Sequence, residues 1–322
     1  MKGQKTEVLR LLEEKNDYLS GKIISEDLNI SRNMVWKYVL ALKNEGYDIK
    51  TSRKGYLLVS KNGGISEYEI RKNLNVDGVS FSVYKTVGST NTVARQMAEK
   101  GAKEKTVVIA SEQTQGRGRR GRSFYSPDSS GIYMSIVLKP NIAVTDAILV
   151  TTCAAVSVCK AIEKVSNNTA EIKWVNDIYL GGKKASGILT EAAINVESGK
   201  PEYVVLGIGI NLFEGENGFP DDIKNIATAV FGSKKEAEKH KNELVSEVLN
   251  SFFDYYQSLT DKAFFDEYKS RMFLIGKPIK VLTDPEYDAV VLDVDSNFEL
   301  KVRLDSGEER LLNSGEVSTR AY

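Results

Sequence analysis

The spacing of hydrophobic residues changes along the first sixty positions of the chain. Apolar side chains first recur on one helical face and then alternate along two short segments. Ser20 and Ser31 stand at predicted N-caps, and Gly46 stands at a predicted helix end. The predicted elements are helices over Thr6–Lys15, Ser20–Leu28 and Arg32–Asn44, then strands over Tyr47–Thr51 and Gly55–Val59. This order predicts a winged helix-turn-helix domain.

Positive charge collects where such a domain would meet DNA. Residues 1–60 hold 11 Lys and Arg against 8 Asp and Glu, whereas residues 276–322 hold 6 against 10. The predicted DNA contacts lie at the start of the third helix and at the hairpin tip: Ser31, Arg32, Asn33, Lys37, Arg53 and Lys54. The alternative is a winged helix that contacts only protein, and the position of these basic residues favours DNA.

Strands and long helices alternate through the middle of the chain, after a linker-like segment at residues 61–64. Ser89 or Thr90 is predicted to cap a helix that Gly101 closes. The predicted helices are Asn91–Lys100, Asp146–Lys164, Lys234–Leu259 and Asp261–Met272, and the predicted strands are Thr106–Ser111, Gly131–Lys139, Glu171–Leu180, Lys184–Ile194 and Tyr203–Leu212. The pair Gly181–Gly182 indicates a hairpin. The pattern predicts a mixed sheet covered by helices.

Short strands separated by Asp, Gly and Asn turns fill the last fifty residues. They are predicted at Ile279–Thr283, Ala289–Val294, Glu299–Leu304 and Glu309–Asn313, which suits a small SH3-like β-barrel. The predicted fold class is therefore α+β in three domains: residues 1–62, 63–273 and 274–322.

One loop carries an unusual density of charge. Residues 116–122 contain four arginines and three glycines, and no acidic residue occurs between Gln113 and Pro127. Four guanidinium groups this close repel one another, so an anion that accepts several hydrogen bonds would order the loop. The glycines permit close approach of the backbone to phosphate oxygens. Phosphate is the predicted ligand.

A second polar cluster interrupts the predicted strands near residue 176. Lys173 is placed to meet a phosphate, Asn176 and Asp177 offer oxygen ligands to Mg²⁺, and Lys184 is placed to reach a carboxylate. Taken alone, such residues are more often solvent-facing strand positions. Gly207, Gly209 and Asn211 on a buried strand indicate close approach by a flat ligand or by neighbouring backbone. Ser89, Thr90 and Asn91 are either a helix cap or hydrogen-bonding groups for a polar ligand.

Composition excludes several kinds of chemistry. His240, the single histidine, lies in a charged run typical of a solvated helix, which argues against triads and His-ligated zinc. Cys153 and Cys159 lie in an apolar helical pattern, where inert buried thiols are expected. No apolar run is expected to span a bilayer and no signal-peptide core is seen in residues 1–20, so no membrane contact and a cytoplasmic location are expected.

The motifs Gly88–Asn91, Gln113–Arg122, Lys173–Gly187 and Gly207–Asn211 follow the order found in biotin–protein ligases. With the winged helix in front, the chain resembles the bifunctional biotin–protein ligases that also repress biotin operons. Val175 and Ser186 depart from the proline and alanine of many members. Neither change removes a charged group.

The resemblance implies a site residue by residue. The implied biotin contacts are Ser89, Thr90, Asn91, Gln113, Arg117, Lys184, Gly187, Gly207 and Gly209. The implied contacts of ATP and the adenylate are Gly116, Arg119, Arg120, Gly121, Arg122, Lys173, Asn176 and Asn211. Arg117, Arg119, Lys173 and Lys184 are the implied catalytic residues, and Asn176 and Asp177 the implied Mg²⁺ ligands.

By the same resemblance, biotin and ATP would form biotinyl-5′-AMP, and a lysine of a biotin carboxyl carrier protein would then accept the biotinyl group. An adenylate-bound homodimer would bind operator DNA. Three alternatives remain: a lipoate-type ligase, a ligand-binding regulator without catalysis, and an RNA-binding protein that uses the arginine–glycine run. The arginine–glycine run together with the N-terminal domain argues against the first, the intact cations of the site against the second, and the absence of low-complexity repeats against the third.

Overall fold

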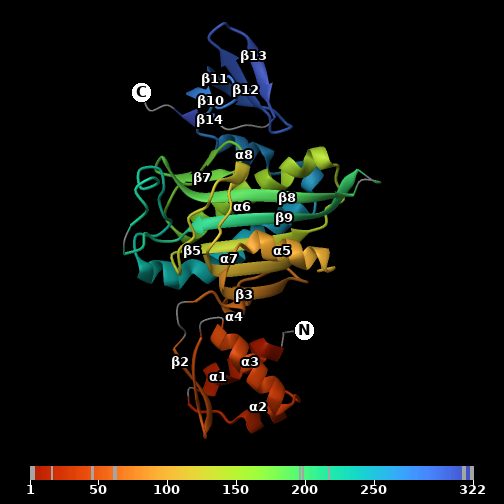
Figure 1. The fold of residues 1–322 in the computed structure, drawn as a ribbon, viewed down its shortest axis with the longest axis vertical. Helices are drawn as coiled ribbons and strands as arrows, with labels where there is room; N and C mark the ends of the chain where they lie inside the picture. The colour runs from red at the N-terminus through yellow and green to blue at the C-terminus, as the bar shows by residue number, and fades with distance from the viewer. Residues whose placement is uncertain are drawn as a thin grey trace.

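The computed structural model describes residues 4–15, 17–44, 47–60, 64–195, 197, 199–216, 218–313 and 317–319. Along its long axis the chain forms a helical N-terminal part, a central sheet with helices, and a C-terminal group of strands (Figure 1). The predicted α+β class is confirmed. The domain boundaries at residues 62 and 273 stay predictions. Gly46 and residues 61–63 of the predicted linker lie outside the described residues.

The N-terminal part contains the predicted three helices and hairpin. They are α1 (Gln4–Lys15), α2 (Gly21–Asp27), α3 (Arg32–Asn44), β1 (Asp48–Ser52) and β2 (Gly55–Ser60). Both predicted N-caps are confirmed, because the hydroxyl of Ser20 accepts from the Ile23 amide and that of Ser31 from the Met34 amide, each at 3.2 Å. Buried apolar residues between Val8 and Ile49 form a core of their own.

A short helix, α4 (Glu67–Lys72), connects this part to the central sheet. Its N-terminal residues contact the winged helix through an ion pair of Lys5 with Glu67 and a hydrogen bond between the hydroxyls of Tyr47 and Ser66. Its backbone is also bound by three polar side chains spaced four residues apart on α7 (Lys234–Tyr256): Asn242, Ser246 and Asn250. Helix α4 is therefore fixed to both parts.

The central sheet has seven strands in the order β3-β4-β5-β9-β8-β7-β6. Its strands are β3 (Ser80–Val87), β4 (Thr106–Gln113), β5 (Gly131–Leu138), β6 (Glu171–Lys173), β7 (Asp177–Leu180), β8 (Lys183–Asn195) and β9 (Lys200–Asn211). Only the β3–β4 pair is parallel. Alternate residues serve opposite faces: Val108 packs under α5 (Thr90–Glu99), whereas Val107 and Ile109 pack toward α6 (Ile148–Val165) and α7.

Two sequence predictions for this region need correction. The predicted strand Glu171–Leu180 is two antiparallel strands, β6 and β7, because the turn between them is bound by tertiary contacts: the Trp174 indole donates to the Phe298 carbonyl, and the Tyr268 hydroxyl donates to the Val175 carbonyl. The predicted helix Asp261–Met272 contains only α8 (Phe265–Ser270), since Lys262 has a left-handed backbone. Strand β3 and helix α4 were not predicted.

Helix α6 corrects a third expectation, that no segment is apolar and long enough to cross a bilayer. Within the described residues, 144–165 pass that test, with a mean hydropathy of 1.5. However, 67% of the tested window is buried, as expected for a core helix that is apolar on all sides. Cys153 and Cys159 lie on this helix, and burial raises the pKa of both thiols, in agreement with the predicted inert state.

The C-terminal strands form one antiparallel sheet in the order β13-β12-β11-β10-β14. They are β10 (Pro278–Val281), β11 (Tyr287–Val294), β12 (Leu300–Leu304), β13 (Glu309–Leu312) and β14 (Val317–Thr319), of which the last was not predicted. In the described residues, no ladder joins β13 to β14, so the observed form is a five-stranded sheet. Phe298 packs against Phe264 and Tyr268, which joins this sheet to the central core.

Candidate functional site

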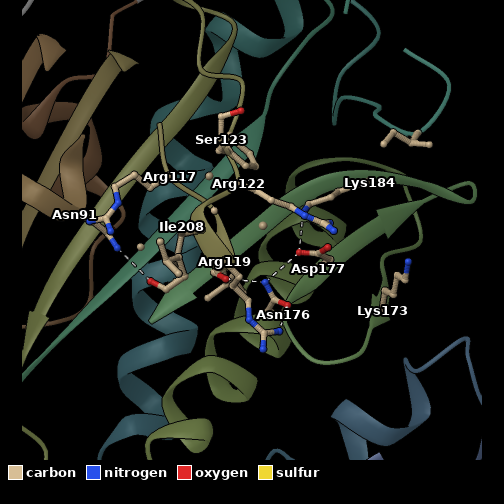
Figure 2. Close-up of a pocket in the computed structure, with 18 of the residues that line it drawn as sticks. Asn91, Arg117, Arg119, Arg122, Ser123, Lys173, Asn176, Asp177, Lys184 and Ile208 are labelled. Carbon is tan, nitrogen blue, oxygen red and sulfur yellow. Dashed lines mark hydrogen bonds and ion pairs between the residues drawn. The ribbon is translucent and has the colours of Figure 1, made fainter. Parts of the chain in front are cut away.

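A cavity of about 460 Å³ lies on the α5 face of the central sheet. Its wall is formed by the N-terminus of α5, the loop at residues 116–122 (the arginine loop), β8, β9 and the β6–β7 turn (Figure 2). Five cationic side chains and one carboxylate line it: Arg117, Arg119, Arg122, Lys173, Lys184 and Asp177. This excess of positive charge suits an anionic ligand that carries several negative charges.

The arginine loop folds back on itself through its backbone. The Gln113 amide donates to the Ser126 carbonyl, and the Phe124 amide donates to the Gly116 carbonyl, both at 3.0 Å. A Cβ at Gly116 would stand 2.3 Å from the Phe124 carbonyl oxygen, so this close approach requires glycine. The fold-back holds the side chains of Arg117 and Arg119 over the cavity.

Three of the cations that line the cavity each contact a polar side chain. An Arg117 Nη1 lies 3.2 Å from a Glu191 carboxylate oxygen, and the Lys184 Nζ lies 2.8 Å from an Asp177 oxygen. Arg119 donates to the Asn176 side-chain oxygen at 3.0 Å (Figure 2). The two ion pairs are partly exposed to solvent, so each stabilises the fold by at most about 1 kcal/mol and an anionic ligand can replace it.

The N-terminus of α5 contributes a buried hydrogen-bond network. Gln113 Oε1 accepts from the amide and the hydroxyl of Thr90, at 2.8 and 3.0 Å. Asn91 donates to Glu191 at 2.8 Å, and Ser135 contacts both Thr90 and Asn91. Ser89 is the N-cap residue by position, but its side chain makes no capping hydrogen bond. Thr90 and Asn91 are thus hydrogen-bonded within the protein, and their contact with a polar ligand stays a prediction.

Glycines form the floor of the cavity. A Cβ at Gly207 would stand 2.1 Å from Asn91 Oδ1, and one at Gly209 would stand 2.6 Å from the Phe124 ring. A Cβ at Gly187 would stand 3.2 Å from the Phe124 ring and 3.2 Å from the end of the Lys184 side chain. Side chains at these positions would displace the groups that surround the ligand space.

Most of the predicted site residues come together, and four do not. Those that line the cavity are Ser89, Thr90, Asn91, Gln113, Arg117, Arg119, Arg122, Lys173, Asn176, Asp177, Lys184, Gly187, Gly207 and Gly209. Gly116, Arg120, Gly121 and Asn211 do not line it. Arg120 is exposed, and the Asn211 amide donates to the Thr228 carbonyl at 3.0 Å. Their predicted contacts with the nucleotide stay predictions.

Several residues that shape the site were not predicted from the sequence. Phe124 covers Gly187 and Gly209, and Glu191 pairs with Arg117. Ser135 is a fully buried serine in the otherwise largely apolar strand β5, a pattern that signals a specific partner. Leu282, which follows β10, also lines the cavity, so the C-terminal sheet contributes to this wall.

Metal binding by protein side chains alone is not supported. In the described part of the chain, no group of three His, Cys, Asp or Glu residues is placed to hold an ion. Asn176 and Asp177 are neighbours that offer one amide and one carboxylate oxygen. This donor set fits Mg²⁺ when phosphate and water complete the shell. His240 on α7 contacts Glu243 of the same helix and Phe231, which precedes it, and it does not line this cavity.

The predicted DNA-binding residues lie at the start of α3 and at the β1–β2 turn. Arg32, Asn33 and Lys37 are exposed on α3, and Arg53 and Lys54 are exposed at the β1–β2 turn. Ser31 caps the helix.

Comparisons with known proteins find matches for the region that contains the cavity and for the N-terminal domain. Residues 83–211 match the Biotin/lipoate A/B protein ligase family, and residues 4–57 match an HTH domain. The bifunctional ligase/repressor BirA of Bacillus subtilis is 40% identical over 218 residues, which cover 67% of this chain and 66% of the relative. BirA of Escherichia coli is 30% identical over 197 residues, which cover 61% of this chain and 60% of that relative.

The alignments thus span just under two thirds of these relatives' length. Among solved structures, the biotin protein ligase from Aquifex aeolicus in complex with biotin and ATP matches with a TM-score of 0.61 and 26% identity, covering 76% of this chain and 99% of that one. Residues 83–211 of the chain are thus similar to the Biotin/lipoate A/B protein ligase family, and the match to an HTH domain lies in front of them.

Proposed function

We propose that this protein activates biotin with ATP and transfers the biotinyl group to a lysine of a biotin carboxyl carrier protein. The observation that carries the proposal is a cavity whose lining holds five cations and one carboxylate above a glycine floor. Biotin carries a carboxylate and ATP a polyphosphate, so their reaction needs cations at the point where the two anions meet.

In the first step a biotin carboxylate oxygen attacks the α-phosphorus of ATP. The bond from this phosphorus to the bridging oxygen breaks, and pyrophosphate leaves. Two unit charges about 4 Å apart repel by about 4 kcal/mol at a protein-like dielectric. Arg117 and Lys184 would exchange Glu191 and Asp177 for ligand oxygens and offset this repulsion. Lys173 lies in the same lining and would contact phosphate.

Magnesium accompanies ATP in this proposal. Asn176 and Asp177 are the residues that would hold the ion together with phosphate oxygens. When bound, Mg²⁺ would neutralise part of the negative charge on the phosphates.

In the second step the amine of the acceptor lysine attacks the acyl carbon of biotinyl-5′-AMP. An amide bond forms, the acyl–oxygen bond to phosphate breaks, AMP leaves, and the amine loses a proton. No protein nucleophile is needed, which agrees with buried thiols and a histidine remote from the cavity. Arg119, bound to Asn176 beside the cavity, would retain the adenylate and limit its hydrolysis.

We also propose that the winged helix represses transcription by binding operator DNA as a homodimer of the adenylate-bound chain. The exposed basic residues of α3 and the β1–β2 turn support the DNA contact. Symmetric half-sites would follow from the twofold axis of such a dimer.

The test of the ligase proposal is incubation of the full chain with biotin, ATP, Mg²⁺ and a purified carrier domain. Mass spectrometry of the carrier should then show one added biotinyl group. A parallel reaction with lipoate separates the two acyl chains known in the family, and Lys184→Met should abolish transfer. If the carrier stays unmodified in the reaction with biotin but is modified in the reaction with lipoate, biotin is not the substrate and the proposal is overturned.

A further inference from the structure

Helix α3 exposes two large apolar side chains. Trp36 is 54% exposed and Leu40 is 43% exposed, four residues further along. The opposite face of the same helix is buried, through Val35, Val39 and Leu42. Packing within the domain therefore explains the apolar residues of the buried face. It does not explain why Trp36 and Leu40 are apolar on the exposed face.

The charge around these two residues indicates the kind of partner. At about 100° per residue, Trp36 and Leu40 occupy the middle of the exposed face. Arg32 and Lys43 fall on one side of this pair, and Asn33 and Lys37 fall on the other. Helix α3 contains no Asp or Glu. An apolar centre between cationic borders fits a polyanion that presents apolar groups between its phosphates.

Duplex DNA has this chemistry in its major groove. The thymine C5 methyl is the apolar group on the base edges there, and phosphates flank the groove on both sides. We infer that Trp36 reads thymine methyl groups and thereby sets the sequence preference of the winged helix. This inference rests on the proposed DNA binding, and it adds the residue and the base feature that would give specificity.

The test uses the full chain with biotin and ATP present. Duplexes that the chain retains from a random-sequence library are resynthesised with deoxyuridine in place of thymidine, which removes only the methyl groups. Wild-type binding should weaken about fourfold for each methyl group that Trp36 buries. Trp36→Ala should bind the thymine and uracil duplexes equally, and Trp36→Phe should recover part of the preference.

Lys37→Ala is the matched control on the same helix. Loss of a phosphate contact should weaken binding to both duplexes by the same factor and reduce the dependence on salt concentration. Because Trp36 is more than half exposed, Trp36→Ala should leave the thermal midpoint and the biotin-transfer activity unchanged.

The outcomes separate this inference from the function beneath it. Equal wild-type binding to thymine and uracil duplexes, or an unchanged preference in Trp36→Ala, overturns the inference while DNA binding stands. Failure to retain any duplex, even at low salt, removes the DNA-binding proposal itself. Dissociation of a DNA-free dimer by Trp36→Ala would assign this face to a second copy of the chain and also overturn the inference.

Discussion

The Phe124 ring lies against Gly209, with room for no further atom between them. A Cβ at position 209 would stand 2.6 Å from the ring, and the nearest ring atom to a Cβ at Gly187 is at 3.2 Å. One aromatic side chain, which follows the arginine loop, therefore fixes the distance between that loop and the floor of the cavity.

Gly209→Ala should displace Phe124 and with it the loop. Overpacking costs about 1–3 kcal/mol, so biotin affinity measured by calorimetry should fall about fivefold to 150-fold. Gly232→Ala is the control, since its Cβ would meet only Glu236 at 4.0 Å. The double variant with Phe124→Ala should lose less than the sum of the single variants, and strict additivity would argue against the contact.

Arg119→Gly should leave adenylate formation largely intact and release the intermediate. The change removes the hydrogen bond to Asn176, 3.0 Å long, and one positive charge beside the cavity. Pyrophosphate formation should continue while free biotinyl-5′-AMP appears in the filtrate, as measured by mass spectrometry. Arg119→Lys retains the charge and should release less. Tight retention of the adenylate by Arg119→Gly would contradict the proposed role.

Ser186→Ala should stabilise the protein or leave its stability unchanged. The Ser186 hydroxyl is fully buried, and no hydrogen-bond partner is found for it in the described residues. Removing an unsatisfied buried hydroxyl is worth about 1 kcal/mol in the free energy of unfolding, measured in urea. Ser135→Ala is the opposite control, because that buried hydroxyl bonds Thr90 and Asn91, and it should lose about 1–2 kcal/mol.

Local signals accounted for most elements of the fold. The caps at Ser20 and Ser31 and the Gly181–Gly182 hairpin were predictable because each depends on contacts within a few residues. The break between β6 and β7 was not, since it depends on Phe298 and Tyr268, about a hundred positions away.

The residues of the site likewise fall into those that could be predicted from the sequence and those that could not. Arg117, Lys173 and Lys184 were predictable from charge in unusual positions, together with the resemblance. Phe124 and Glu191 were not, because an aromatic residue after a loop and an acid on a strand have no distinctive spacing. Their partners come from segments distant in sequence: Arg117 and Asn91 for Glu191, and Gly187 and Gly209 for Phe124.

Lys241 on α7 should make stability depend on pH. Its side chain is buried, with 5% exposed, and burial lowers the pKa of this lysine to about 8. Glu238 and Asp128 oppose that shift, and Lys234 adds to it. In the unfolded chain the amine titrates near 10.5, so between about pH 8 and 10.5 the unfolded state binds more protons. The free energy of unfolding should therefore rise with pH in this window, and below it the full cost of burying the charge remains.

Lys241→Met should remove this dependence and stabilise the protein at pH 7 by about 1–3 kcal/mol, since one pKa unit corresponds to about 1.4 kcal/mol. Urea unfolding at pH 7 and pH 9.5 measures both effects and stays below the range where most tyrosines ionise. Lys239→Met changes an exposed lysine of the same helix and should shift neither value. A pH dependence that persists in Lys241→Met would mean that another group causes it.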